Sequence, residues 1–272
     1  MSHARPLFLD ATHNRPMVVH LDGPALRVTQ DGRSDGRYPM RMLSRIHSIG
    51  NVDWSCDVLH RLMEEGITIT FESRSRGRIG VLLPHQEIDD DCNQHLEELL
   101  DSLNGWVRLE EWRSSANRRE ILRLQQRIPV EMKDLRISKV KQQLEQRAER
   151  YLHPEPLHRI RKKLLDLGSG LVAQQLMSAG VEVRNLRKIH VNAPSLDHIQ
   201  LFSELIGWDI EVLLYQLAKG IRRRFGRHPQ LQQPRLQRLI LRAFNQRGSR
   251  LSSIIDQQII HYRNWLSREL NQ

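Results

Sequence analysis

The sequence predicts an α+β protein, in which a small β-rich N-terminal domain is followed by a larger all-α C-terminal domain. In residues 67–71 and again in 79–83, apolar and polar side chains alternate, which is the period of a half-buried strand. From residue 96 onward, apolar side chains instead recur every three or four positions, as on amphipathic helices. We therefore predict a β-rich domain over residues 1–84, a linker over 85–95 and an all-α domain over 96–272.

The predicted linker is acidic and follows Pro84, which ends the last expected strand. It contains the run Asp89, Asp90 and Asp91. A cation site is one interpretation of this run, but the run lacks the glycine and the alternating oxygen ligands of a calcium loop. Because blocks of like charge usually face water, we interpret the segment as a solvated linker.

Short strands separated by turn residues make up the first domain. The first two strands are expected at residues 7–9 and 17–19. Asp22-Gly23 is a hairpin signal, and residues 25–30 alternate in polarity up to a second turn at Asp31-Gly32. These features predict an antiparallel hairpin close to the N-terminus.

Residues 38–84 are expected to contain a helix followed by two strands. Ser55 fits an N-cap, residues 58–63 carry apolar side chains at helical spacing, and Gly66 ends the helix. The two alternating segments described above follow it. We assign residues 43–46 to a turn that packs under the sheet.

The second domain is expected to be helical throughout, and it shows no internal repeat. Proline and glycine residues separate its apolar-periodic segments. The expected helices lie at residues 96–103, 106–112, 121–128, 140–152, 164–177, 195–217, 236–244 and 251–266.

The composition favours a polyanionic partner. The 272 residues contain 42 Lys and Arg against 32 Asp and Glu, which gives a formal net charge of +10. A field of that sign attracts nucleic acid, and arginine is suited to bidentate phosphate contacts. Cys56 and Cys92 are too few and too far apart for a zinc site or a disulfide framework. No apolar run is long enough to span a membrane, and the N-terminus lacks the apolar core of a signal peptide, so we expect a cytoplasmic protein.

Residues 222–272 are rich in arginine, and their only acidic residues are Asp256 and Glu269. Such a density of cations on amphipathic helices is typical of phosphate binding. A basic surface that keeps the protein soluble, or that docks an acidic partner, is the alternative. The residues that we predict to bind nucleic acid are Arg222, Arg223, Arg224, Arg227, Arg235, Arg238, Arg242, Arg247 and Arg250.

Several short motifs of the first domain occur together. They are Tyr38-Pro39 before a Leu/Ile run, Ile49-Gly50-Asn51-Val52, Glu65-Gly66-Ile67 at the helix end, the strand at 67–71, and the run from Gly80 to Pro84. With the preceding hairpins, this stretch resembles the N-terminal domain of the CRISPR-associated spacer integrases, the first protein of the adaptation pair.

The resemblance implies an activity and a set of partners. Members of that family join short DNA fragments to a repeat by metal-dependent attack of DNA 3′-hydroxyls. It implies a homodimer formed mainly through the N-terminal domain, a small ferredoxin-like adaptation partner and no membrane. It also implies Mg²⁺ or Mn²⁺ as the cofactor, held in the helical domain by a Glu, a His and a downstream acid.

Candidate ligands for such a metal follow from the same resemblance. Residues 168–190 are similar to the helix, the glycine-led turn and the apolar residue that precede the family's histidine, which places His190 at that position. Glu204 is the best candidate for the downstream acid, and Glu145, in a segment that reaches Tyr151, for the upstream glutamate. The predicted catalytic and metal-binding residues are therefore His190, Glu204 and Glu145.

The sequence also allows alternatives for the metal ligands and for the function. His198 with Asp209 or Glu211 is a second possible register for the histidine and the acid. Gln146 stands where the family has a glycine, which favours a second hypothesis, a catalytically degenerate relative that binds nucleic acid or scaffolds a CRISPR complex. A nucleic-acid-binding regulator unrelated to CRISPR is a third.

Overall fold

A computed structural model describes residues 4–11, 16–73, 77–84, 90–128, 134–182, 196–231 and 233–270. The chain divides into two compact units, Met1–Glu87 and Ile88–Gln272. All described strands lie in the first unit, whereas the second unit is built of helices. The predicted α+β fold class is confirmed.

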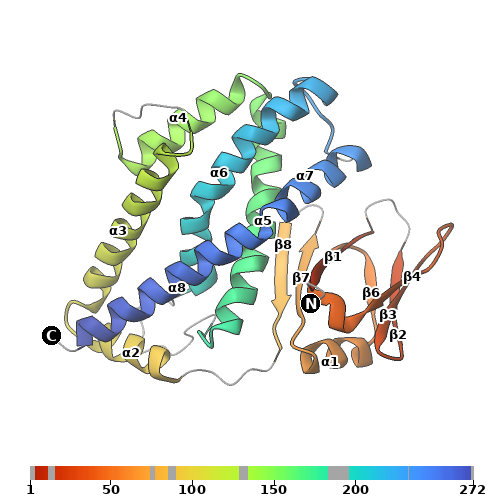
Figure 1. Ribbon diagram of the computed structural model, residues 1–272, viewed down its shortest axis with the longest axis horizontal. Coiled ribbons are helices and arrows are strands. Elements are labelled where there is room, and N and C mark those ends of the chain that lie inside the picture. Colours follow the sequence, from red (N-terminus) through yellow and green to blue (C-terminus); the bar gives the residue numbers. More distant parts are fainter. Residues whose placement is uncertain are drawn as a thin grey trace. The chain divides into compact units, whose positions relative to one another are not determined.

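Two four-stranded sheets and one α-helix form the first unit (Figure 1). One sheet has the order β1-β5-β7-β8, with β1, β5 and β7 parallel and β8 antiparallel to β7. The other has the order β4-β3-β2-β6 and contains the predicted hairpin, β2 and β3. The elements are β1 (Arg5–Ala11), β2 (Met17–Asp22), β3 (Ala25–Gln30), β4 (Gly36–Pro39), the 3-10 turn η1 (Met40–Met42), β5 (Leu43–Gly50), β6 (Val52–Trp54), α1 (Cys56–Glu64), β7 (Thr68–Ser73) and β8 (Gly77–Leu82).

The helix α1 begins and ends as its sequence predicts. The Ser55 hydroxyl accepts a hydrogen bond from the backbone N–H of Val58, and Gly66 takes a φ of +71° just after the helix. Val58 and Leu62 are fully buried, in one core cluster with Ile46 of β5. The apolar face of α1 therefore belongs to a core that contains residues of both sheets.

Residues 43–46 begin strand β5, so the prediction of a turn there is wrong. This strand lies inside its sheet, between β1 and β7. The polar residues His47 and Ser48 are buried within it, and His47 Nε2 lies 2.8 Å from Glu72 Oε2 on β7. A central strand is buried on both faces, so the alternation that reveals a half-buried strand is missing here.

Seven helices form the described part of the second unit, and α6 lies at its centre. The helix α6 packs against α3, α4, α5, α7 and α8, as Figure 1 shows. None of the helices in the described ranges combines the length and the apolar composition needed to cross a bilayer. The helices are α2 (Asp90–Asp101), α3 (Gly105–Gln125), α4 (Ile137–Glu149), α5 (Pro154–Ser178), α6 (His198–Phe225), α7 (Pro234–Gln246) and α8 (Gly248–Leu270).

The predicted acidic linker overlaps a helix. Helix α2 begins at Asp90, so residues 90–95 of the expected linker are helical. Acidic side chains are favourable in the first turn of a helix, where they face the positive end of its dipole. A block of like charge is therefore also typical of a helix start. The next helix begins at Gly105, where an added Cβ would clash with the carbonyl oxygen of Leu99.

His198 is part of an aromatic core between α3, α6 and α8. The ring of Trp112 contacts those of Phe202 and Tyr262, with centroids 6.4 and 5.0 Å away. His198 Nδ1 lies 2.6 Å from the backbone oxygen of Glu182, and its Nε2 lies 3.2 Å from the Tyr262 hydroxyl. A carbonyl oxygen can only accept, so Nδ1 carries the proton and Nε2 accepts from the tyrosine. Burial lowers the pKa of His198 to about 4, and the ring is neutral at physiological pH.

This histidine should make the stability of the helical unit depend on pH. The pKa of His198 is about 4 in the folded protein and 6.5 ordinarily, so the unfolded state binds more protons between these values. The stability that depends on the neutral ring is fully present above pH 6.5. It is lost progressively as the pH falls from 6.5 to about 4. The free energy of unfolding should decrease across that window by up to about 3 kcal/mol on this account.

The variant His198→Asn, which keeps a donor near the position of Nδ1, should lose this part of the pH dependence. Urea unfolding followed by tryptophan fluorescence at several pH values across the window measures it. The carboxylates titrate in both proteins, so the difference between the two curves isolates the histidine. Parallel curves for the variant and the wild type would contradict the assignment.

Candidate functional site

Three carboxylates project from the central helix α6, and each meets an arginine that lies in another helix or just beyond its end. The first is Glu204, which accepts hydrogen bonds from Arg113 of α3, with 2.9 Å between Arg113 Nε and Glu204 Oε2. Asn117 Nδ2 lies 3.4 Å from its other oxygen. Burial by itself lowers the pKa of Arg113, but the carboxylates of Glu204 and Glu110 outweigh it and raise that pKa above its ordinary value. The arginine and Glu204 form a charged pair.

The second acid, Asp209, is the most deeply buried of the three. Its side chain is 4% exposed and pairs with Arg127 from the end of α3, which is 18% exposed. Few water molecules can reach either group, so the pair has to neutralise itself within the protein. This contact joins the middle of α6 to α3.

The third acid, Glu211, shares an arginine with Glu145 of α4. Arg161 of α5 donates from Nε to Glu211 Oε1 at 2.7 Å and from Nη1 to Glu145 Oε1 at 2.9 Å. Burial raises the pKa of Glu211, and Arg161 offsets this only in part. Burial by itself lowers the pKa of Arg161, but the carboxylates of Glu211 and Glu145 outweigh it and raise that pKa above its ordinary value. One guanidinium thus joins α4, α5 and α6.

These pairs bear on the predicted metal ligands. Glu145 and Glu204 lie in described helices but bind different arginines, whereas Glu145 is brought together with Glu211. His190 lies outside the described residues, and His198 of the second register uses both ring nitrogens in the core. Among the described residues, no group of three metal-binding side chains occurs. Carboxylates that already hold guanidinium groups do not fit the hard-ligand set that Mg²⁺ or Mn²⁺ requires.

The arginines that end α6 serve two purposes. Arg222, Arg223 and Arg224 occupy its last turn, where cations are favoured by the helix dipole, and all three are exposed. Arg222 donates to the backbone oxygen of Arg150 at 2.7 Å, and Arg227 donates to that of Glu149 at 3.3 Å. Both therefore hold the carboxyl end of α4 as well as adding positive charge to the surface.

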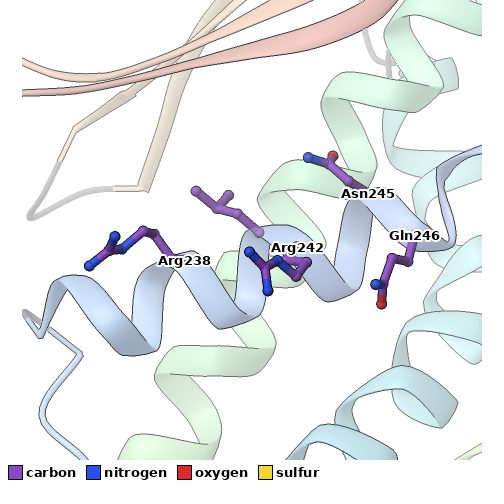
Figure 2. Close-up of a pocket in the computed structure, with 5 residues that line it drawn as sticks. Arg238, Arg242, Asn245 and Gln246 are labelled. Atoms are coloured by element: carbon purple, nitrogen blue, oxygen red, sulfur yellow. The ribbon is translucent and has the colours of Figure 1, made fainter.

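The helix α7 separates an apolar face from a basic one. Leu236, Ile240 and Phe244 are buried at a spacing of four residues. On the other side, arginines four positions apart, Arg238 and Arg242, are exposed. These two line a pocket with Leu241, Asn245 and Gln246, and Figure 2 shows how the polar ones project from α7. We call Arg235, Arg238, Arg242, Asn245 and Gln246 the α7 surface.

Of the two predicted arginines beyond α7, Arg250 is exposed and Arg247 is half-buried. Arg247 donates a hydrogen bond to Gln216 of α6. Burial lowers the pKa of Arg247, and the nearby cations Arg127 and Arg250 lower it further. We therefore infer that Arg247 mainly stabilises the contact with α6, whereas Arg250 adds positive charge to the surface.

Sequence reasoning missed the interior arginines of this unit. Arg113, Arg127 and Arg161 resemble any other arginine of a basic helical chain, and their partners lie 91, 82 and 50 positions away. One partial signal exists. Arg113 and Arg161 lie in α3 and α5, Arg127 lies just beyond α3, and each is within three residues of a buried position, Trp112, Ile160 or Leu124.

Comparison with solved structures identifies the fold. The chain is similar to a Cas1 protein from Thermotoga maritima, with a TM-score of 0.78, 12% sequence identity and coverage of 96% of this chain and 97% of that one. A casposase bound to an integration product matches with a TM-score of 0.71, 12% identity and coverage of 97% and 91%. The TtCas1–DNA complex matches with a TM-score of 0.60, 13% identity and coverage of 94% and 90%. The fold is that of the Cas1 proteins.

The sequence itself identifies the family. The model of the CRISPR-associated protein Cas1 family matches residues 13–193, which is more than half of the chain. A search of curated protein sequences returns no significant match. The chain belongs to the Cas1 family, which confirms the resemblance found in the first domain.

The Arg127–Asp209 pair should be costly to break on one side only. Arg127→Met leaves a buried carboxylate without its cation and should destabilise the protein by about 3 kcal/mol, whereas the double variant R127M/D209L should recover most of that loss. Urea unfolding of the wild type, both single variants and the double variant measures the coupling. Glu155→Gln, which breaks the exposed Arg159–Glu155 pair of α5, is the control and should cost less than about 0.5 kcal/mol. Equal losses in R127M and in the double variant would contradict this account.

Proposed function

We propose that this Cas1-family protein binds DNA through its α7 surface and acts in CRISPR spacer acquisition. The observation that carries the proposal is the exposed arginine pair of α7, Arg238 and Arg242, which flank one pocket on a helix whose opposite face is buried. The exposed arginines at the end of α6 add further positive charge to the helical unit. Guanidinium groups bind phosphate oxygens in bidentate fashion, and the backbone phosphates dominate affinity for DNA.

The neutral groups of the α7 surface support the same proposal. Asn245 and Gln246 line the pocket beside the two arginines and offer amide donors and acceptors. Such side chains commonly accompany arginine in contacts with phosphate and sugar. Two of the similar structures are described as bound to DNA or to an integration product. The overall charge of +10 would also steer the chain towards DNA.

The partners and the setting are part of the proposal. Family membership favours a homodimer that forms through the first unit and a small ferredoxin-like adaptation partner. It also favours a cytoplasmic location, where DNA for spacer acquisition is found. Without catalysis, such a subunit would bind DNA or act as a scaffold within a CRISPR complex.

Metal-dependent strand transfer or cleavage is the second candidate function. It is favoured by the extent of the family match, which covers both Glu145 and His190. The ion pairs of Glu145 and Glu204 argue against it, because each carboxylate already holds a guanidinium group. We therefore propose DNA binding as the principal function, with a catalytically degenerate site.

Removing the two pocket arginines should weaken DNA binding. In Arg238→Ala/Arg242→Ala, two phosphate contacts are lost, so the slope of log K against log salt should become shallower by about 2. The loss should be similar for unrelated DNA sequences, because phosphate contacts carry no sequence information. Fluorescence anisotropy with labelled duplexes over a range of salt concentrations measures both quantities.

The matched control changes the same charge on another helix. Arg118→Ala/Arg119→Ala removes two exposed arginines of α3 and should lower affinity much less. Equal losses in the two double variants would reduce the effect to net charge and reject the α7 surface as the binding site. A wild-type protein that does not bind DNA even at low salt would reject the proposal as a whole.

An integration assay separates the two candidate functions. Purified protein, with its adaptation partner present, is mixed with a short DNA duplex carrying free 3′-hydroxyls, a repeat-containing target and Mn²⁺. We expect DNA binding without joined products. Products that require Mn²⁺ and disappear in His190→Ala and Glu145→Ala would establish the second candidate instead.

A further inference from the structure

A single guanidinium group occupies the space between two carboxylates of the helical unit. Glu145 of α4 and Glu211 of α6 approach each other from different helices, and Arg161 of α5 lies between them. We propose that Arg161 is a permanent internal cation, which holds Glu145 and Glu211 in place of a divalent metal ion and makes this part of the protein independent of metal.

The contacts of Arg161 satisfy both acids at once. Its Nε and Nη2 lie 2.7 and 3.3 Å from the two oxygens of Glu211, and its Nη1 lies 2.9 Å from Glu145 Oε1. Arg161 and Glu211 are 16% and 15% exposed, whereas Glu145 is 49% exposed. The fork of the guanidinium thus makes the bidentate contact with the more buried acid and a single contact with the other.

Charge balance leaves no place for a further cation. Glu145 and Glu211 contribute two negative charges, and Arg161 contributes one positive charge. The second comes from Lys141 of α4, which interacts with Glu211 and lies over the ring of Trp208, with its Nζ 5.6 Å from the ring centroid. A divalent ion added to this balanced group would bring two uncompensated positive charges next to the guanidinium of Arg161, which is unfavourable.

The backbone of α5 fixes Arg161 where it is. Ile160 precedes it and Leu164 follows one turn later, and both side chains are fully buried in the helical unit. A metal ion could reach the two acids only if the arginine side chain left both, since its backbone is fixed. This inference does not rest on DNA binding and would stand if the α7 surface bound nothing.

The decisive experiment measures Mn²⁺ binding by the intact chain. Free Mn²⁺ is followed by its electron paramagnetic resonance signal in titrations of the wild type and of Glu145→Gln. We expect the two proteins to bind Mn²⁺ alike, because Glu145 is already neutralised. A binding component that is present in the wild type and absent in Glu145→Gln would overturn the proposal.

Removing the arginine should create the site that it fills. In Arg161→Gln two carboxylates face each other without their shared cation, so the variant should melt several degrees lower than the wild type. Mn²⁺ should raise the melting temperature again by a few degrees. The response should vanish in the double variant R161Q/E211Q.

Arg159→Gln is the matched control on the same helix. Arg159 pairs with the exposed Glu155, and its loss leaves no buried acid, so this variant should neither melt earlier nor respond to Mn²⁺. A folded Arg161→Gln variant that gains no response to Mn²⁺ would also overturn the proposal. If that variant does not fold, the wild-type titration still decides.

Discussion

The arginine–carboxylate pairs of α6 are the interaction on which the helical unit depends. This helix contacts five others, and its buried side chains are apolar except for His198 and Asp209. Glu204, Asp209 and Glu211 also lie on this helix, and they pair with Arg113 of α3, Arg127 just beyond α3 and Arg161 of α5. An unpaired charge at such positions costs several kcal/mol, about half the stability of a typical domain, so the pairs fix the register of the neighbouring helices.

The same pairs divide the arginines of this basic protein into two groups. Arg113, Arg127 and Arg161 neutralise the acids of α6, whereas Arg238 and Arg242 of α7 are exposed. Our proposals for function follow from this division. Acids committed to guanidinium groups favour a structural use for the helical core, and exposed arginines favour a surface that binds a polyanion.

The first unit shows the same principle in a sheet. Strand β5 is central and carries polar side chains that are nevertheless buried. Hydrogen bonding between strands makes this tolerable, as for His47 and Glu72. The buried pair of His47 and Glu72 thus joins two strands, whereas α1 and α7 pack through simple apolar faces.

The sequence alone determined the fold class, the family resemblance and those elements with one buried face. The helix α1 with its Ser55 cap and the amphipathic α7 follow from local periodicity, because periodicity reports burial along a single element. Only the tertiary structure decided that β5 is a strand, that Glu145 meets Glu211 and that Arg161 lies between them. A pairing between side chains dozens of positions apart depends on how helices pack, and no local pattern records it.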